Sequence, residues 1–368
     1  MTGRGRTRIA VAGIGLAALV VVAAIGVSAP HGRAQPVAGS SQRGTAAPAR
    51  APIQPRAEPA AIEIEARPIA TFEIGKPNQV RFGRLQFRGG LELTSRSKSF
   101  GGISGLAMLD AARFLAVTDK SEWLAGRIVY QGQRPVGVAD AAMSPIMGPD
   151  GRTLYERGWY DTESLTIDRG IAYVGIERVN RIVRFDYGKL GMAAPAKLVP
   201  WPAGLSGLPT NRGVEALVAV PRGTPASPLA GALIVITERA LDPAGNVRAA
   251  LVGGPRPGLF AVARHDGFDV SDAALLPDGD LLLLERRFTW TTGVAMRLRR
   301  IPIASIAPGA VVDGPVLITA DMGFQIDNME ALGVHVGDGG ETVLTLMSDD
   351  NFSFLQRTVL LQFTLLDE

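Results

Sequence analysis

The feature that most constrains this chain is a repeat of about 57 residues that contains only β-type segments. Each repeat begins with a small or acidic residue shortly before a leucine. These first residues lie 59, 52, 57 and 58 positions apart, at Ser104, Glu163, Glu215, Asp272 and Glu330. An apolar strand follows in each repeat and runs into an acidic residue. A period of this size without helical segments is typical of a β-propeller, in which each repeat forms one blade.

The second strand of each repeat is almost continuously apolar, as in Leu281–Leu284. Such a strand is typical of the inner part of a blade, where both faces are packed against neighbours. The Asp278-Gly279 pair that precedes this strand indicates a hairpin turn. The repeat therefore predicts blades of antiparallel strands.

The number of blades depends on how the remaining residues are counted. Five repeats are visible, and residues 79–97 contain strand-like segments that would supply part of another. The fold class predicted is therefore an all-β propeller with six blades, while five or seven also fit the chain length. Pairing strands from the two chain ends would close the ring and remove exposed sheet edges.

Residues 1–34 have the composition of an export signal. Arg4, Arg6 and Arg8 precede residues 9–29, an apolar run of 21 residues without a charge, and a cleavage pattern of small residues ends at Ala34. The run is also long enough to span a bilayer, so an uncleaved anchor is an open alternative. The basic amino terminus predicts a periplasmic or secreted domain, held at the inner membrane if the signal is retained.

Residues 35–68 are rich in proline and alanine, which predicts a disordered spacer between the signal and a propeller domain at 69–368. Membrane contact is expected only through residues 9–29, if these are not cleaved. A monomer is expected.

Charge and composition exclude several functions. Residues 61–368 hold 31 basic and 34 acidic groups, so the folded region has no basic excess that would favour nucleic acid. The chain has no cysteine, which excludes disulfides, thiolate catalysis and cysteine-bound metals. It has only three histidines, so a serine–histidine triad is not predicted.

Carboxylates at repeat-equivalent positions are the candidate functional residues, because equivalent positions of successive blades converge on one axis. They are predicted to be metal ligands, and clustered oxygen ligands without cysteine or histidine favour a hard cation such as calcium. The eight are Asp119, Glu163, Glu177, Glu215, Glu238, Glu285, Glu330 and Asp349.

A basic residue directly follows four of these acids, and these four are predicted to contact an anionic substrate: Lys120, Arg178, Arg239 and Arg286. The alternative is purely structural, with each acid paired to a basic residue of a neighbouring blade.

Several motifs together resemble the phytase-like domain family, known as "esterase-like activity of phytase" and found in exported bacterial proteins. They extend over about residues 85–365, in order: Phe87–Leu93, Phe100–Leu106, Asp161–Leu165, Asn211–Leu217, Leu276–Asp280 with Glu285-Arg286, Asn328–Leu332 and Ser348–Phe352.

The resemblance implies a β-propeller and calcium-assisted hydrolysis of phosphate esters, in which the acids hold the cation and basic groups orient a small anionic ligand. The chain lacks the dense acidic loop of the alkaline phytases, which argues against phytate as the substrate. Two alternatives stay open: a non-catalytic periplasmic binding or scaffold module, and a lactone or carboxyl-ester hydrolase on a calcium-centred propeller.

The amino-terminal pattern generates a test of location. We expect a reporter fused after Glu368 to be active in the periplasm, because the basic residues ahead of the apolar run should stay in the cytoplasm. The measurement is the activity of an alkaline phosphatase fusion compared with that of a reporter that works only in the cytoplasm. Activity of the cytoplasmic reporter alone would contradict the prediction.

Overall fold

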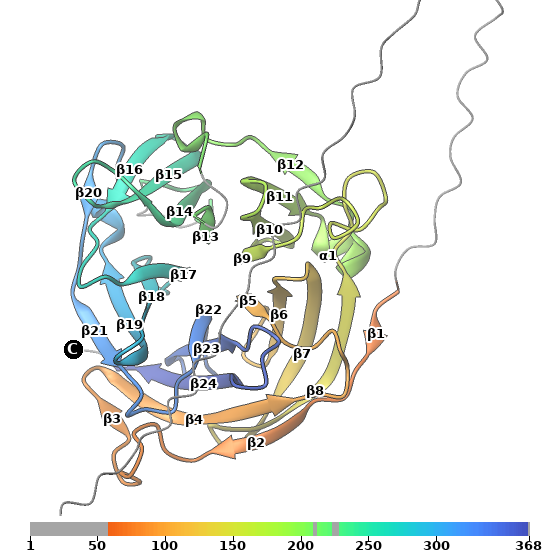
Figure 1. The fold of residues 1–368 in the computed structure, drawn as a ribbon, viewed down its shortest axis with the longest axis vertical. Helices are drawn as coiled ribbons and strands as arrows, with labels where there is room; N and C mark the ends of the chain where they lie inside the picture. Colours follow the sequence, from red (N-terminus) through yellow and green to blue (C-terminus); the bar gives the residue numbers. More distant parts are fainter. Residues whose placement is uncertain (1–57, 209–211, 223–227, 367–368) are drawn as a thin grey trace, which may run out of the picture. The chain divides into compact units, whose positions relative to one another are not determined.

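The computed structural model describes residues 58–208, 212–222 and 228–366. In these residues the strands form five sheets around one axis, so the domain is an all-β propeller (Figure 1). Each innermost strand packs against the innermost strands of the two neighbouring sheets. These innermost strands are β5 (Ile103–Met108), β9 (Thr162–Asp168), β13 (Val214–Ala219), β17 (Asp269–Leu275) and β22 (Asn328–Val336).

Each sheet is one blade, and its three innermost strands run outward from the axis in chain order with antiparallel pairing. Blade 1 continues from β5 through β6 (Arg113–Thr118), β7 (Glu122–Gln131) and β8 (Arg134–Pro145) to β1 (Ala60–Ala61). Blade 2 continues from β9 through β10 (Ile171–Ile176) and β11 (Arg181–Phe185) to β12 (Lys197–Val199). Blade 3 continues from β13 through β14 (Ala232–Leu241), β15 (Val247–Gly253) and β16 (Gly258–Val262), with β20 (Val311–Val312) parallel to β16 at the edge.

Blades 4 and 5 complete the ring. Blade 4 continues from β17 through β18 (Leu281–Thr289) and β19 (Gly293–Ile301) to β21 (Val316–Ala320). Blade 5 continues from β22 through β23 (Thr342–Asp349), β24 (Thr358–Leu365) and β4 (Leu85–Thr94) to β2 (Glu65–Ile69), with β3 (Arg81–Phe82) also paired to β4. The helices are short: α1 (Tyr187–Leu190) and 3-10 turns at Gly191–Ala193, Ala203–Leu205 and Ile303–Ser305.

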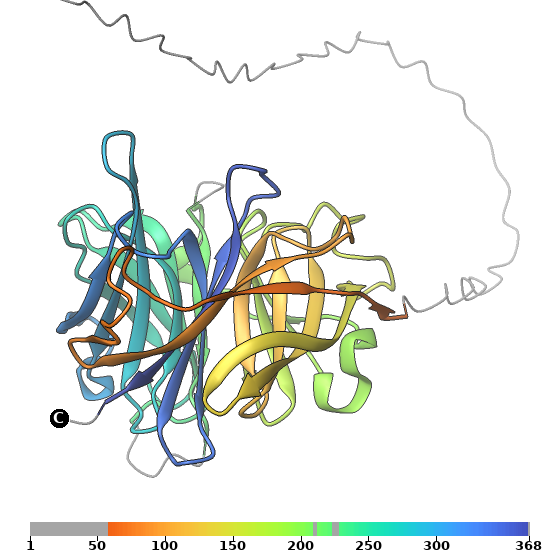
Figure 2. The same ribbon diagram turned by 90° about the horizontal axis from the view of Figure 1, so that it is seen from below.

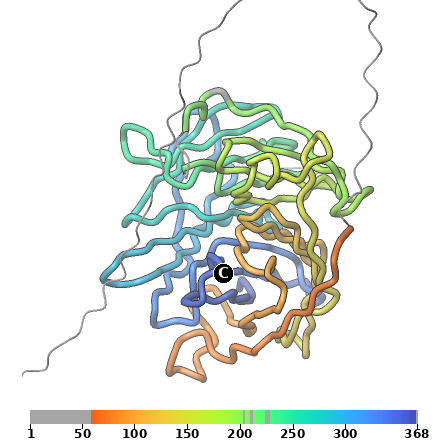
Figure 3. Tube along the Cα trace, turned by 45° about the vertical axis from the view of Figure 1, so that its right-hand side comes forward, coloured from red at the N-terminus to blue at the C-terminus, as the bar shows by residue number. Residues whose placement is uncertain are grey.

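Strands from both ends of the chain close the ring, as the sequence predicts. Strand β4 pairs with β24 from Thr358 opposite Leu93 to Leu365 opposite Leu85. Strand β1 pairs with β8 of blade 1, so residues 58–94 bridge the first and the last blade. Figure 3 shows this early segment, in orange, beside the carboxy-terminal strand in blue.

The prediction of six blades is wrong, because the described residues form five. Residues 79–97 do not begin a blade of their own. They contain β3 and β4, and β4 is the fourth strand of blade 5. The chain needs this early strand to pair with the late strand β24, which would otherwise be an open edge.

The expected boundary of the domain at residue 69 also differs from the structure, because β1 and β2 begin before it, at Ala60 and Glu65. The predicted signal at 1–34 and the spacer up to residue 57 lie outside the described residues. Within the described residues, no helix combines the length and the apolar character needed to cross a membrane.

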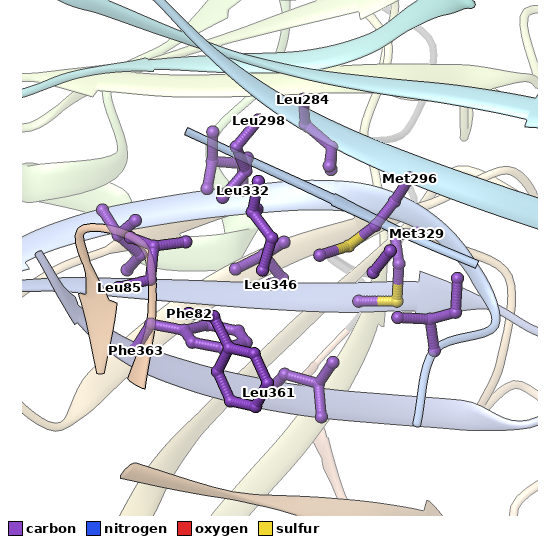
Figure 4. Close-up of a cluster of buried hydrophobic side chains, with 14 of the residues drawn as sticks. Phe82, Leu85, Leu284, Met296, Leu298, Met329, Leu332, Leu346, Leu361 and Phe363 are labelled. Carbon is purple, nitrogen blue, oxygen red and sulfur yellow. The ribbon is translucent and has the colours of Figure 1, made fainter. Parts of the chain in front are cut away.

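The core lies between the blades. The second strands are buried on both faces, and in β18 the four residues Leu281–Leu284 are all fully buried. Figure 4 shows the cluster between blades 4 and 5, where leucine and methionine side chains of β18, β19, β22 and β23 interleave. An aromatic group continues this cluster at the closing strands, with ring centroids of Phe72 and Phe363 4.9 Å apart. The cluster therefore ties the ring closure to the core.

We expect Phe363→Ala to lower the free energy of unfolding by about 3–5 kcal/mol, because it empties a fully buried site at the ring closure. Urea denaturation measures this loss. Phe354→Ala is the matched control, since that ring is 95% exposed and its removal should change the value by no more than about 0.5 kcal/mol. Equal stability of the two variants would mean that the closing strands do not contribute to the folded ring.

Candidate functional site

A β-bulge interrupts the innermost strand of every blade at the same position. In blade 3, Val214 lies opposite Thr237 and Ala216 opposite Ile236, so Glu215 has no partner in β14. A bulge redirects a side chain and bends the strand. The bulged residues of the five blades are Ser104, Glu163, Glu215, Ser271 and Glu330.

A second set of equivalent residues follows from the same register. Glu238 comes directly after Thr237, the residue opposite Val214, and its backbone amide donates to the carbonyl of Gly213 at 3.0 Å. Each other blade has a residue in this place beside the bulge. The five are Asp119, Glu177, Glu238, Arg286 and Asp349.

Blade 4 corrects two of the sequence-based assignments. Glu285 lies opposite Val270, as Thr237 lies opposite Val214, so Arg286 and not Glu285 is equivalent to Glu238. The bulged residue is likewise Ser271 and not Asp272. Asp272 lies one residue after the bulge, and Glu285 lies one residue before the position of Arg286. A shift of one residue along a strand moves a side chain to the other face of the sheet.

The two displaced acids are buried away from the other carboxylates. Glu285 accepts a hydrogen bond from Arg299 at 2.5 Å within the sheet. Asp272 accepts from the backbone amides of Ala273 at 2.8 Å and Leu332 at 2.7 Å, and the second bond joins blade 4 to blade 5. Glu285 is therefore a structural partner of an arginine of its own blade, whereas the structural alternative expected a basic residue of a neighbouring blade, and Asp272 links two blades.

The remaining seven predicted carboxylates line one pocket of about 250 Å³ at the mouth of the ring. Asp161 adds an eighth carboxylate, and Arg239, Arg286 and Asn351 complete the lining. We call this the acidic pocket, and its carboxylates are Asp119, Asp161, Glu163, Glu177, Glu215, Glu238, Glu330 and Asp349.

Asp161 is the carboxylate that sequence reasoning missed. Its carbonyl accepts from the amide of Glu177 at 2.9 Å, just as the carbonyl of Gly102 accepts from Asp119 in blade 1. Asp161 therefore occupies a place that is glycine in blades 1 and 3 and an acid again only in blade 4, at Asp269, so the repeat marks it weakly. The signal available was its place in the motif Asp161-Thr162-Glu163, two residues before a bulged acid.

Two of the predicted basic residues lie at the pocket and two do not. Arg239 forms a double hydrogen bond with Glu238 at 2.8 and 2.7 Å. Arg286 lies 3.2 Å from Glu330 and 3.5 Å from Glu238. Lys120 instead lies over the ring of Phe352, and Arg178 over the ring of Tyr160, both outside the pocket lining.

Burial and mutual repulsion keep several of the acids protonated. Burial, with the charges of Glu238 and Asp161 added, raises the pKa of Glu177 to about 7, although the amide of Gly213 donates to its Oε1. Burial also raises the pKa of Asp119 to about 6 and that of Asp349 to about 9. The pKa values of Glu163 and Glu215 are raised well above the ordinary range by burial and by neighbouring carboxylates.

Glu215 is the carboxylate that most needs a ligand. It is 8% exposed, and among the described residues no donor or cation lies within hydrogen-bond or ion-pair distance of it. Its carboxylate oxygen lies within 4.8 Å of oxygens of Glu177 and Glu238, a spacing that a metal ion could bridge. The oxygens of Glu215 open into the pocket, and in the same pocket Oδ1 of Asp119 is fully buried without a hydrogen-bond partner among the described residues. Such buried atoms are rare in folded proteins, and each requires an explanation.

The chemistry of this group fits a hard cation. All three groups offer oxygen, Glu177 and Glu215 come from neighbouring blades, and no cysteine exists to favour a softer metal. Eight carboxyl groups face only two guanidinium groups, so the pocket has a deficit of positive charge that a divalent ion would reduce. The triad of Glu177, Glu215 and Glu238 is thus a candidate metal centre.

Comparison with solved structures finds other chains at low identity. The PQQ-bound aldose sugar dehydrogenase from Streptomyces coelicolor is 10% identical with a TM-score of 0.39, covering 77% of this chain and 99% of that one. The putative oxidoreductase (glucose dehydrogenase) from Thermus thermophilus is 15% identical with a TM-score of 0.31, covering 82% and 100%. At this level the similarity concerns the fold alone. No curated protein sequence matches the chain.

Comparison with family models gives one assignment. The phytase-like model, described as "Esterase-like activity of phytase", matches residues 98–352. The match covers more than half of the chain and includes all five bulged strands and the whole acidic pocket. The chain therefore belongs to the phytase-like family.

Proposed function

We propose that the acidic pocket binds calcium and that the domain hydrolyses phosphate esters with its help. The observation that carries the proposal is Glu215, a buried carboxylate without a partner among the described residues, at bridging distance from Glu177 and Glu238. A structural role for these acids would instead leave each of them paired with a donor or an arginine. Membership of the phytase-like family agrees with an ester substrate.

A bound calcium ion would supply a Lewis acid that polarises a phosphoryl oxygen. Arg286, which lines the pocket between two blades, would donate to another oxygen of the phosphoryl group. In the hydrolysis the ester P–O bond breaks and the oxygen of water forms a new bond to phosphorus. Asp119, whose pKa is about 6, would take a proton from that water, and the leaving alkoxide receives a proton in turn.

Calcium should stabilise the parent protein and Glu215→Gln should remove most of this effect. At a calcium concentration of 100 times Kd the gain is about 2.7 kcal/mol, which raises Tm by roughly 5 °C for a domain of this size. The variant should bind calcium at least about tenfold more weakly, because a carboxamide offers a neutral oxygen in place of a charged ligand. Calorimetric titration and thermal melts measure both quantities.

Glu341→Gln is the matched control, because Glu341 pairs with Arg88 away from the pocket and its change should leave calcium affinity unaltered. Hydrolysis of 4-nitrophenyl phosphate and of the corresponding diester, with calcium and with a chelator, tests the activity. Calcium binding without any hydrolysis would favour the non-catalytic binding module. A Tm that ignores both calcium and chelator would overturn the metal site.

The metal-free protein should become less stable as pH rises from about 5 to 8. The raised pKa values mean that the folded state holds protons on Glu177 and Asp119 where the unfolded chain has lost them. Each such group lowers the free energy of unfolding by up to about 1.4 kcal/mol per pH unit, from its ordinary pKa up to the raised one. Urea unfolding in a chelator at several pH values measures this slope.

Saturating calcium should flatten or reverse the slope, because the ion displaces the same protons and binds more tightly as pH rises. Glu177→Gln should also reduce the slope in the chelator, while Glu341→Gln should not. If the free energy of unfolding of the parent and of Glu177→Gln depends on pH in the same way, Glu177 does not hold a proton in the folded protein as described.

A further inference from the structure

A second pocket of about 400 Å³ opens beside the acidic pocket. The two share Arg239, Arg286, Glu330 and Asn351 in their linings, so a molecule could occupy both at once. Arg287, Phe288 and Val294 form its outer wall, and we call it the arginine–aromatic pocket. The repeat does not point to it, because most of the residues that it does not share with the acidic pocket belong to blade 4.

The outer wall carries aromatic side chains that are exposed and do not pack in the core. Phe288 is more than half exposed, and its ring stacks edge to face on Trp290, with centroids 5.3 Å apart. Trp290 is 94% exposed. Both lie on the hairpin between β18 and β19, which extends beyond the ring on the same face as the loop between β23 and β24 (Figure 2). Gln356 of that loop also lines the pocket.

One guanidinium group of this pocket, that of Arg287, has no ion pair among the described residues, although the carboxylates of Asp269 and Glu330 also line the pocket. Arg239 and Arg286 are paired with the acids of the first pocket. Arg287 lies over the ring of Phe268 and donates to the carbonyl of Asp266, but it forms no ion pair within the described ranges. An aromatic wall next to a guanidinium group that has no ion pair suits a ligand with a flat ring and a single anionic group.

We propose that the arginine–aromatic pocket binds the organic part of the substrate, and that the substrate class is a phosphate ester of an aromatic alcohol. The inference rests on the proposed function, because it assumes that the phosphoryl group lies at the boundary with the acidic pocket. The ring would then stack on Phe288, with Trp290 supporting it from behind. A polyphosphorylated, ring-saturated ester such as phytate would meet only one guanidinium group without an ion pair, and it has no aromatic ring to stack on Phe288.

The test compares two stable anions, phenylphosphonate and methylphosphonate, by calorimetric titration with and without calcium. We expect the parent to bind phenylphosphonate about tenfold more tightly, the factor that one good aromatic contact provides. A double change, Phe288→Ala with Trp290→Ala, should abolish the preference. Arg287→Gln should weaken both anions by a similar factor, because it removes charge and leaves the aromatic wall.

Phe354→Ala serves as the matched control, since that exposed ring lies on the neighbouring loop outside the pocket lining and should leave the preference intact. A Tm of the double variant within a few degrees of the parent would show that it folds. Equal binding of the two phosphonates, or a preference that survives the double change, would overturn the inference. Absence of calcium binding would overturn only the proposed function, because the phenyl preference is also measured without the ion.

Discussion

Backbone pairing between β4 and β24 is the interaction on which the rest of the structure depends. It joins an early strand to the last one and leaves no open edge on β24 in blade 5. Because the ring is closed, the five innermost strands have to converge on one axis. Residues that lie more than two hundred positions apart, such as Asp119 and Asp349, then line the same pocket. The site is thus a consequence of ring closure and not of any one motif.

Convergence brings an energetic cost that the pocket only partly offsets. Two carboxylates about 5 Å apart repel by roughly 3 kcal/mol at an effective dielectric constant near 20, and burial removes the water that would screen them. Blade 4 lowers this cost by placing Arg286 where the other four blades have an acid. Protonation of Glu177 and Asp349 lowers it further in the absence of a cation. A bound divalent ion would displace these protons and would itself reduce the repulsion between the carboxylates.

The exception in blade 4 also shapes the region beside the acidic pocket. The same strand that brings Arg286 into the ring of acids carries Arg287 and Phe288 close to the turn of the β18–β19 hairpin. There they line the arginine–aromatic pocket. One blade therefore breaks the acidic pattern and supplies a basic and aromatic surface. If the acidic pocket binds a cation as proposed, this surface beside it would suit an ester whose phosphoryl group lies between the two.

The period of the repeat is enough to predict the all-β propeller, the positions of the five inner strands and seven of the eight acids at the mouth, because these recur once per blade. It does not predict the number of blades, since pairing between distant ends of the chain is not a local property. It also misplaces Asp272 and Glu285, because a bulge shifts the register by one residue and only the pairing of β17 with β18 reveals it. The place of Asp161 is not acidic in every blade and the pocket beside Arg287 occurs once, and it is the closed ring that brings both to its mouth.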